Sequence, residues 1–289
     1  MIEKDLKTWN LEFGAQPELD VQADFASISV VPVEPGGIPR IEANVSVLDR
    51  LKVEVIKDTT SVRVSLRQLA DPLNPRNWWD WGGNRKLTFF VPQGIVARIH
   101  ADAGKISISG LTAKGIELQA EAGAITIQDV RADFHVRASA GKVEGDRISG
   151  SLDITSNAGS VRLRIDSLEP GTHRIHADVG SVKVEIPRQA AVRVETSTDL
   201  GSVKNSFCST SDAPAILQIS AAVGSIHVKE ANGAGVHLEK REDAFEVRPR
   251  SEETPIASGK EVDQILKMVE DGKLSAKDAG DLIRALHGR

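Results

Sequence analysis

One short phrase recurs along this chain, and its recurrence limits the possible folds more than any other feature. The phrase reads ADAGKISIS at residues 101–109, ADVGSVKVE at 177–185 and AAVGSIHVK at 221–229. Aligned on the central glycine, it has seven copies, spaced by 18 to 23 residues, at Gly104, Gly123, Gly141, Gly159, Gly180, Gly201 and Gly224. A period near 20 residues is typical of a solenoid, in which each repeat is one rung that buries its apolar side chains by stacking on its neighbours. The sequence therefore predicts an all-β fold, a parallel β-solenoid.

Apolar residues alternate on both sides of each glycine, but the parity of the alternation changes there. Ala97 and Ile99 lie seven and five residues before Gly104, whereas Ile106 and Ile108 lie two and four residues after it. Alternation with period two predicts a strand with one buried face. A change of parity requires a bend, and glycine can adopt the positive φ that a bend needs. Each repeat glycine is therefore predicted to form a corner between two strands of one rung.

The residues six positions before the glycines form an outward row of nearly alternating charge. The row is Arg98, Glu117, His135, Asp153, Arg174, Glu195 and Gln218. Opposite charges attract when rungs stack about 4.8 Å apart, and like charges repel. The row therefore predicts that each rung stacks on the next one in sequence order.

The repeat sets the expected domain boundaries. A degenerate copy at residues 23–31, with Ala26 in the glycine position, extends the array towards the N-terminus. We expect a solenoid domain over residues 8–248, with irregular rungs to about residue 92 and regular rungs over 93–230. Residues 249–258 form a polar, proline-bearing linker.

From residue 259 to 289 the apolar period becomes helical, which predicts a small two-helix appendage. Its two stripes are Val262, Ile265, Leu266 and Val269, and Ala279, Leu282, Ile283 and Leu286. Two helices of about 11 residues are marginal alone in water. We therefore expect the hairpin to self-associate or to dock on a partner protein, with Leu266, Val269, Leu282, Ile283 and Leu286 as candidate contact residues.

Composition excludes several classes of partner and cofactor. A net charge of −5 and a pI near 5.9 give no reason to expect nucleic-acid binding. The single cysteine, Cys208, cannot form an internal disulfide. The sequence begins without a signal-peptide pattern and has no apolar run of about 20 residues that could form a transmembrane segment. We expect a cytoplasmic protein, with peripheral association with the cell envelope left open.

The repeated A-x-[AV]-G-[KS]-[IV]-x-[IV] rungs resemble the putative-adhesin family of β-strand-repeat proteins of unknown function, which are common in bacteria. The segment ILKMVEDGKLSAKDAGDLIRAL is similar to the SHOCT-like helical hairpins that accompany those repeats. The resemblance implies a non-enzymatic protein, linked in some members to cell-envelope stress or surface exposure. It supplies no catalytic, cofactor-binding or metal-ligating residues.

An enzymatic alternative depends on one group of side chains. Glu117, His135 and Asp153 fall on three consecutive rungs, where a histidine between two acids could bind a metal or transfer a proton. The same residues belong to the alternating charge row, and we favour that structural role. We therefore assign no catalytic, cofactor or metal site.

Two residues before the glycines, the row Asp102, Glu121, Ser139, Asn157, Asp178, Asp199 and Ala222 also offers two interpretations. Asp102 with Glu121, and Asp178 with Asp199, would be adjacent acidic pairs that Ca²⁺ could neutralise. Asp, Asn and Ser are also favoured at turns because they bind local backbone groups. We favour the turn interpretation.

A tryptophan cluster and a basic stripe complete the candidates. Trp78, Trp79 and Trp81 lie in a loop bounded by Gly and Pro, where they could form a docking patch or cover the irregular rungs. Arg162, Lys183, Lys204 and His227, three positions after the glycines, together with Arg164, form a stripe that could face an acidic partner. A solvated face is the simpler explanation.

Overall fold

A computed structural model describes residues 6–44, 51–57, 61–68 and 86–231. These residues form strands and contain no helix. Within them the fold is all-β and solenoid-like, as the repeat predicts. The linker at 249–258 and the two-helix appendage at 259–289 lie outside the described residues.

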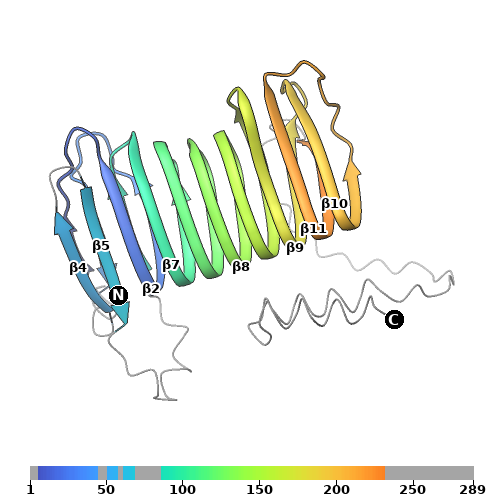
Figure 1. Ribbon diagram of the computed structural model, residues 1–289. Coiled ribbons are helices and arrows are strands. Elements are labelled where there is room, and N and C mark those ends of the chain that lie inside the picture. The colour runs from blue at the N-terminus through green and yellow to red at the C-terminus, as the bar shows by residue number, and fades with distance from the viewer. Residues whose placement is uncertain (1–5, 45–50, 58–60, 69–85, 232–289) are drawn as a thin grey trace, which may run out of the picture.

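The strands join in one mixed sheet that runs the length of the molecule (Figure 1). They are β1 (Leu6–Asn10), β2 (Glu18–Pro32), β3 (Arg40–Asn44), β4 (Leu51–Lys57), β5 (Ser61–Gln68), β6 (Lys86–Val91), β7 (Ile95–Ser109), β8 (Thr112–Leu168), β9 (Gly171–Pro187), β10 (Val192–Asn205) and β11 (Ala215–Ala231). Strand β8 is 57 residues long because three successive rungs follow one another in it without a break.

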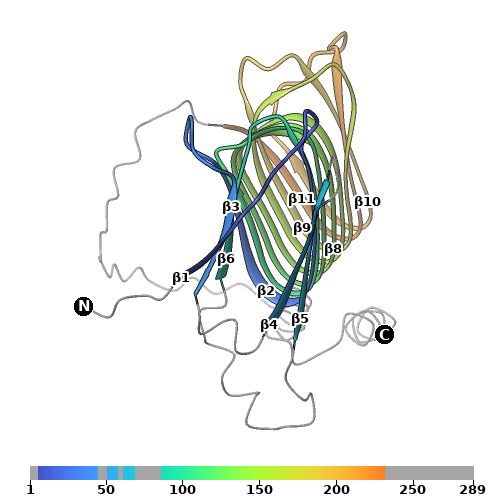
Figure 2. The same ribbon diagram turned by 90° about the vertical axis from the view of Figure 1, so that its left-hand side faces the viewer.

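Each rung is a bent ribbon, which is seen along the stack in Figure 2. We call the residues before the repeat glycine the first arm and those after it the second arm. The rungs pair in parallel with glycine beside glycine, for example Gly104 with Gly123 and Gly159 with Gly180. This register brings equivalent positions of successive repeats side by side.

The repeat glycines form the predicted corners. All seven have positive φ, between 131° and 149°. They also lie against the backbone of the neighbouring rung: a Cβ atom built on Gly180 would be 1.7 Å from the carbonyl oxygen of Gly159. Glycine is therefore required both by the backbone angle and by the close stacking of the corners.

A second corner, where the second arm ends, was not predicted from the sequence. Gly110, Asp129 and Arg147 occupy equivalent positions there, with φ values of 68°, 53° and 51°. The guanidinium of Arg147 donates hydrogen bonds to both carboxylate oxygens of Asp129 on the rung below. This pair joins consecutive corners across the stack.

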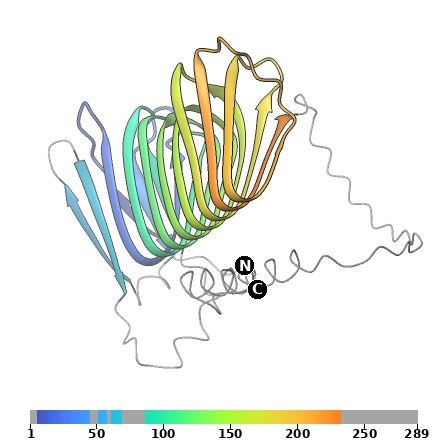
Figure 3. The ribbon, with the colours of Figure 1, turned by 45° about the vertical axis from the view of Figure 1, so that its right-hand side comes forward.

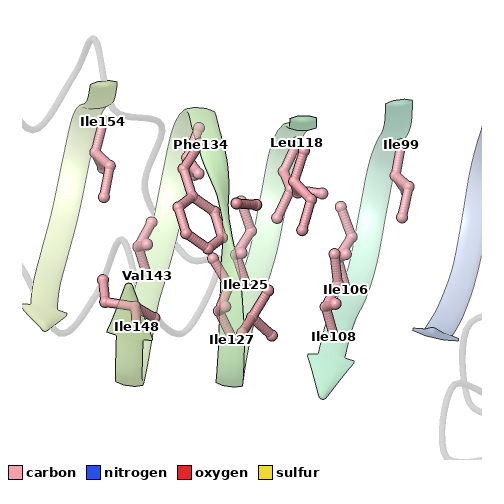
Figure 4. Close-up of a cluster of buried hydrophobic side chains, with 14 of the residues drawn as sticks. Ile99, Ile106, Ile108, Leu118, Ile125, Ile127, Phe134, Val143, Ile148 and Ile154 are labelled. Carbon is pink, nitrogen blue, oxygen red and sulfur yellow. The ribbon is translucent and has the colours of Figure 1, made fainter. Parts of the chain in front are cut away.

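The alternating apolar residues of both arms point between the arms and form the core (Figure 4). Ile99, Leu118, Val136 and Ile154, each five residues before a repeat glycine, are all buried, and Phe134 is buried two residues before Val136. His173 occupies an apolar position of the repeat and is 1% exposed. Its ring Nδ1 accepts a hydrogen bond from the Leu152 amide (3.1 Å), and its Nε2 lies 2.8 Å from the Glu169 carbonyl oxygen.

The degenerate copy forms a true rung, because β2 pairs in parallel with β7 and places Ala26 beside Gly104. On the other side of β2, β5 stacks on the first arm and β6 on the second. The segment between β5 and β6, which carries Trp78, Trp79 and Trp81, lies outside the described residues. The antiparallel pairs β1–β3, β3–β6 and β4–β5 account for the predicted irregularity.

The C-terminal end departs from the predicted stacking order. Strand β11 pairs with β9, and β10 is outermost, so the spatial order is β9, β11, β10 (Figure 3). The loop between β10 and β11 explains the exchange. Ser209 Oγ accepts from the Val194 amide (2.7 Å) and the Thr210 amide donates to the Val192 carbonyl (3.2 Å), so this loop covers the outer edge at the start of β10. The expectation that every rung stacks on the next in sequence is therefore wrong at this end.

Candidate functional site

The outward row on the first arm is a series of pairwise contacts. Arg98 lies between two acids, with Nη1 3.3 Å from Glu18 Oε2 and Nε 3.8 Å from Glu117 Oε2. His135 Nδ1 lies 3.2 Å from Asp153 Oδ2. The side chains of Glu117, His135 and Asp153 are 50%, 62% and 47% exposed. The structure thus brings the three residues onto adjacent rungs but directs Glu117 to Arg98, on an open face.

The row nearer the corner makes local hydrogen bonds. Glu121 accepts from Ser139 Oγ (2.7 Å) and Gln119 Nε2 (3.1 Å), and these bonds hold the pKa of its carboxyl below the ordinary value. His100 Nε2 lies 3.1 Å from Asp102 Oδ1. No group of three or more metal-ligating side chains is found among the described residues.

The predicted pairing of Asp178 with Asp199 is wrong. Strand β11 lies between β9 and β10, so Ala222 separates the two aspartates. Instead, Asp178 Oδ1 lies 2.9 Å from His176 Nε2.

A Ser–His–Asp chain results from the same exchange of strands. His176 Nδ1 lies 2.7 Å from Ser220 Oγ on β11, while Nε2 faces Asp178. No pattern in the sequence indicated this contact, because Ser220 becomes a neighbour of His176 only when β11 stacks on β9. The backbone of both strands is engaged in the parallel ladder, so it offers no pair of free amides for an oxyanion. The chain is best described as a hydrogen-bonded contact between two rungs.

The second arms carry a shallow concavity of about 440 Å³ over Gly145, with charged side chains around it. Those charges are paired: Arg162 Nη1 lies 3.2 Å from Glu144 Oε1, and Arg164 Nη1 lies 3.7 Å from Asp146 Oδ1. The predicted basic stripe is present, in the spatial order Arg162, Lys183, His227, Lys204. Two of its arginines are neutralised by acids on the neighbouring rung.

Among the described residues, large apolar side chains lie close together and exposed to solvent only on β10, at the end of the stack. Leu200 is 47% exposed and Val203 is 42% exposed, and Ile38 is the remaining exposed large apolar residue among those described. Leu200 and Val203 flank the corner Gly201 on the outermost rung.

The predicted contact residues cannot be compared with this geometry. Trp78, Trp79, Trp81, Leu266, Val269, Leu282, Ile283 and Leu286 all lie outside the described residues. None of the described segments is a helix long and apolar enough to cross a membrane.

Comparison with family models identifies the repeat region. Residues 96–234 match the family "Toastrack DUF4097", and residues 260–289 match a SHOCT-like domain. The regular rungs are thus similar to the Toastrack family. The resemblance to adhesin-like repeat proteins with a SHOCT-like hairpin is thereby confirmed. A search of curated proteins finds no match for the chain.

Solved structures resemble this chain only distantly. One is described as a "putative cell adhesion protein" from Clostridium sporogenes (12% identity, 79% of this chain and 100% of that chain, TM-score 0.37). Another is a "putative adhesin" from Bacteroides fragilis (15% identity, 78% and 98%, TM-score 0.34). A third is a "putative lipid binding protein" from Parabacteroides distasonis (8% identity, 78% and 97%, TM-score 0.24). At these values they transfer neither a ligand nor a residue role to this chain.

Proposed function

We propose that this Toastrack protein is a non-enzymatic binding or scaffold protein that presents the faces of a rigid β stack. The observation that carries the proposal is the pairing of outward side chains between rungs. Arg98 with Glu117, His135 with Asp153 and Arg162 with Glu144 each join neighbouring rungs. Such ladders stabilise a long regular surface, whereas catalysis needs polar groups that converge on one point.

The metal-dependent or carbohydrate-active alternative, with Glu117, His135 and Asp153 as its residues, gains no support from the described geometry. His135 and Asp153 contact each other on an open face, and Glu117 contacts Arg98. A link to cell-envelope stress, which the family resemblance implies, is part of this proposal.

In this proposal the SHOCT-like segment supplies self-association or partner capture. Its apolar stripes include Leu266 and Ile283, and short amphipathic helices need a surface to cover them. The full-length chain carrying Leu266→Asp and Ile283→Asp is expected to show a smaller mass in light scattering or to lose its bound partner. Circular dichroism should show an unchanged β signal.

The matched control is Lys267→Asp, which changes the charge of the same segment outside the apolar stripe. If the double variant keeps the mass and the partners of the wild type, the hairpin is not an association element. If the β signal collapses, the hairpin is a structural part of the stack, and the proposed division of roles is wrong.

A further inference from the structure

We propose that the outer edge of β10 binds a second copy of this chain, antiparallel and about a two-fold axis that passes between Gly201 and Ser202. This contact goes beyond the proposed role of the hairpin, because it uses the open edge of a strand and not the apolar stripes of the hairpin. Four observations on β10 carry the proposal.

The first is the exposure of two apolar side chains beside the corner, of which Val203 stands at a position that is buried on the other rungs. Val203 stands beside Ile226 of β11, and Ile226 is 1% exposed because it has a rung on each side. Val203 is 42% exposed and its neighbour Leu200 is 47% exposed. Another strand on this edge would complete both rows.

The second observation is the unprotected edge itself. In the described part of the chain, β10 pairs with β11 and with no strand on its other side. The loop through Ser209 and Thr210 satisfies only Val192 and Val194 on that edge. Proteins usually protect an open edge with proline or a bulge, but no proline lies within β10 and its register with β11 stays regular through the corner. The free stretch therefore extends from about Thr196 to Asn205.

The third observation is charge complementarity. When Leu200 lies opposite Val203 of an antiparallel second copy, Asp199 lies opposite Lys204 of that copy, and the two-fold axis produces each pair twice. Asp199 and Lys204 are both exposed, and no ion pair to either is found among the described residues. One register thus satisfies the apolar and the charged side chains together.

The same register places Asn205 of the second copy opposite Thr198. The hydroxyl of Thr198 is buried and has no hydrogen-bond partner among the described residues. The Asn205 carboxamide accepts from the Phe207 amide through Oδ1 (3.0 Å), so its NH₂ group is available as a donor.

The fourth observation argues against another rung of the same chain. A residue that stacks in parallel on Gly201 must lack a Cβ, because a Cβ on Gly201 itself would be 1.7 Å from the Gly224 carbonyl oxygen and every corner of the stack repeats that contact. At the repeat spacing of 18 to 23 residues, the positions that follow Gly224 are residues 242–247, and none of them is glycine. In the antiparallel register, Gly201 instead lies opposite Ser202 of the second copy and does not stack on a parallel corner.

Charge exchange in the full-length protein tests the proposal. Asp199→Lys and Lys204→Asp are each expected to weaken dimer formation at least tenfold, because each places like charges opposite one another twice. An equimolar mixture of the two variants is expected to regain the dimer, since both contacts of the heterodimer then join opposite charges. Sedimentation velocity over a concentration series measures this. All chains also carry Leu266→Asp and Ile283→Asp, so that association through the hairpin does not contribute.

The control is Asp133→Lys, an equal change of charge on the exposed surface of an internal rung, which should leave the dimer intact. Three results would overturn the proposal: a wild-type edge that stays monomeric at high concentration, single variants that dimerise like the wild type, or a mixture that fails to restore the dimer. Each differs from a failure of the proposed hairpin role, which is measured in chains with an unaltered β10.

Discussion

Each of the seven repeat glycines satisfies two separate requirements, and comparison with Gly171 at the start of β9 can distinguish them. Gly180 has φ of 146° and no room for a Cβ atom, whereas Gly171 has φ of 133° and no atom within 4 Å of a built Cβ. Gly171→Ala therefore introduces only backbone strain, and Gly180→Ala adds a backbone clash.

We expect Gly171→Ala to lower the free energy of unfolding by about 1–3 kcal/mol. Gly180→Ala should lower it by more than about 4 kcal/mol, because a neighbouring rung must move. Chemical denaturation of both variants measures the difference. Equal losses would mean that the close approach of the corners is not a constraint in solution.

The pair at the second corner predicts a dependence of stability on pH. Hydrogen bonds from Arg147 hold the pKa of Asp129 below its ordinary value in the folded state. The stabilisation is therefore complete above the pKa of the unfolded chain, about 3.9, and is lost as the pH falls through the lower folded value.

Asp129→Asn should lower the melting temperature at pH 7, and the difference from the wild type should shrink below about pH 4. Asparagine tolerates the positive φ of 53° at this position, so the change tests the charge rather than the backbone. Asp133→Asn is the control. A difference that stays constant from pH 7 to pH 2 would rule out the ion pair as its source.

At the scale of elements, β10 and β11 have nearly the same sequence pattern but different surroundings. Strand β11 has a parallel neighbour on both edges, and β10 has one on a single edge among the described residues. Amide exchange depends on the opening of such hydrogen bonds. We expect residues 196–205 to exchange at least tenfold faster than residues 219–228 when the protein is dilute enough to be monomeric. Hydrogen exchange read out by mass spectrometry tests this, and equal protection would contradict the strand order.

The repeat pattern predicted the rungs and corners because both depend on spacing and on glycine. It could not predict the order β9, β11, β10, because Gly201 and Gly224 have equivalent flanking residues and either rung could stack on β9. The choice depends on the loop through Ser209, which contacts the outer edge of β10. The Ser220–His176 contact and the separation of Asp178 from Asp199 follow from that order. The sequence pattern therefore could not predict them either. Part of the candidate site was therefore decided by one loop rather than by the repeat.

At the scale of the whole molecule, the two ends of the stack share an arrangement. The first rung in sequence, β2, lies between β7 and the β5 and β6 strands, and the last, β11, lies between β9 and β10. At the C-terminal end β10 is outermost, whereas at the N-terminal end β4 lies beyond β5, and β3 and β1 lie beyond β6. The first and last copies of the repeat, β2 and β11, therefore both have neighbours on each edge.

This arrangement has a mechanical consequence. A force applied to the chain beyond residue 231, as by an ATP-driven unfolding machine, acts first on β11, which has hydrogen-bonded neighbours on both edges. Because β11 runs parallel to those neighbours, pulling along it loads many ladder bonds in shear at once instead of unzipping them singly. A pull from the opposite end reaches β1 first, which lies at an edge of the described sheet and pairs with β3. A stack of this kind resists extraction from its C-terminal side more strongly than one whose rungs follow the order of the chain.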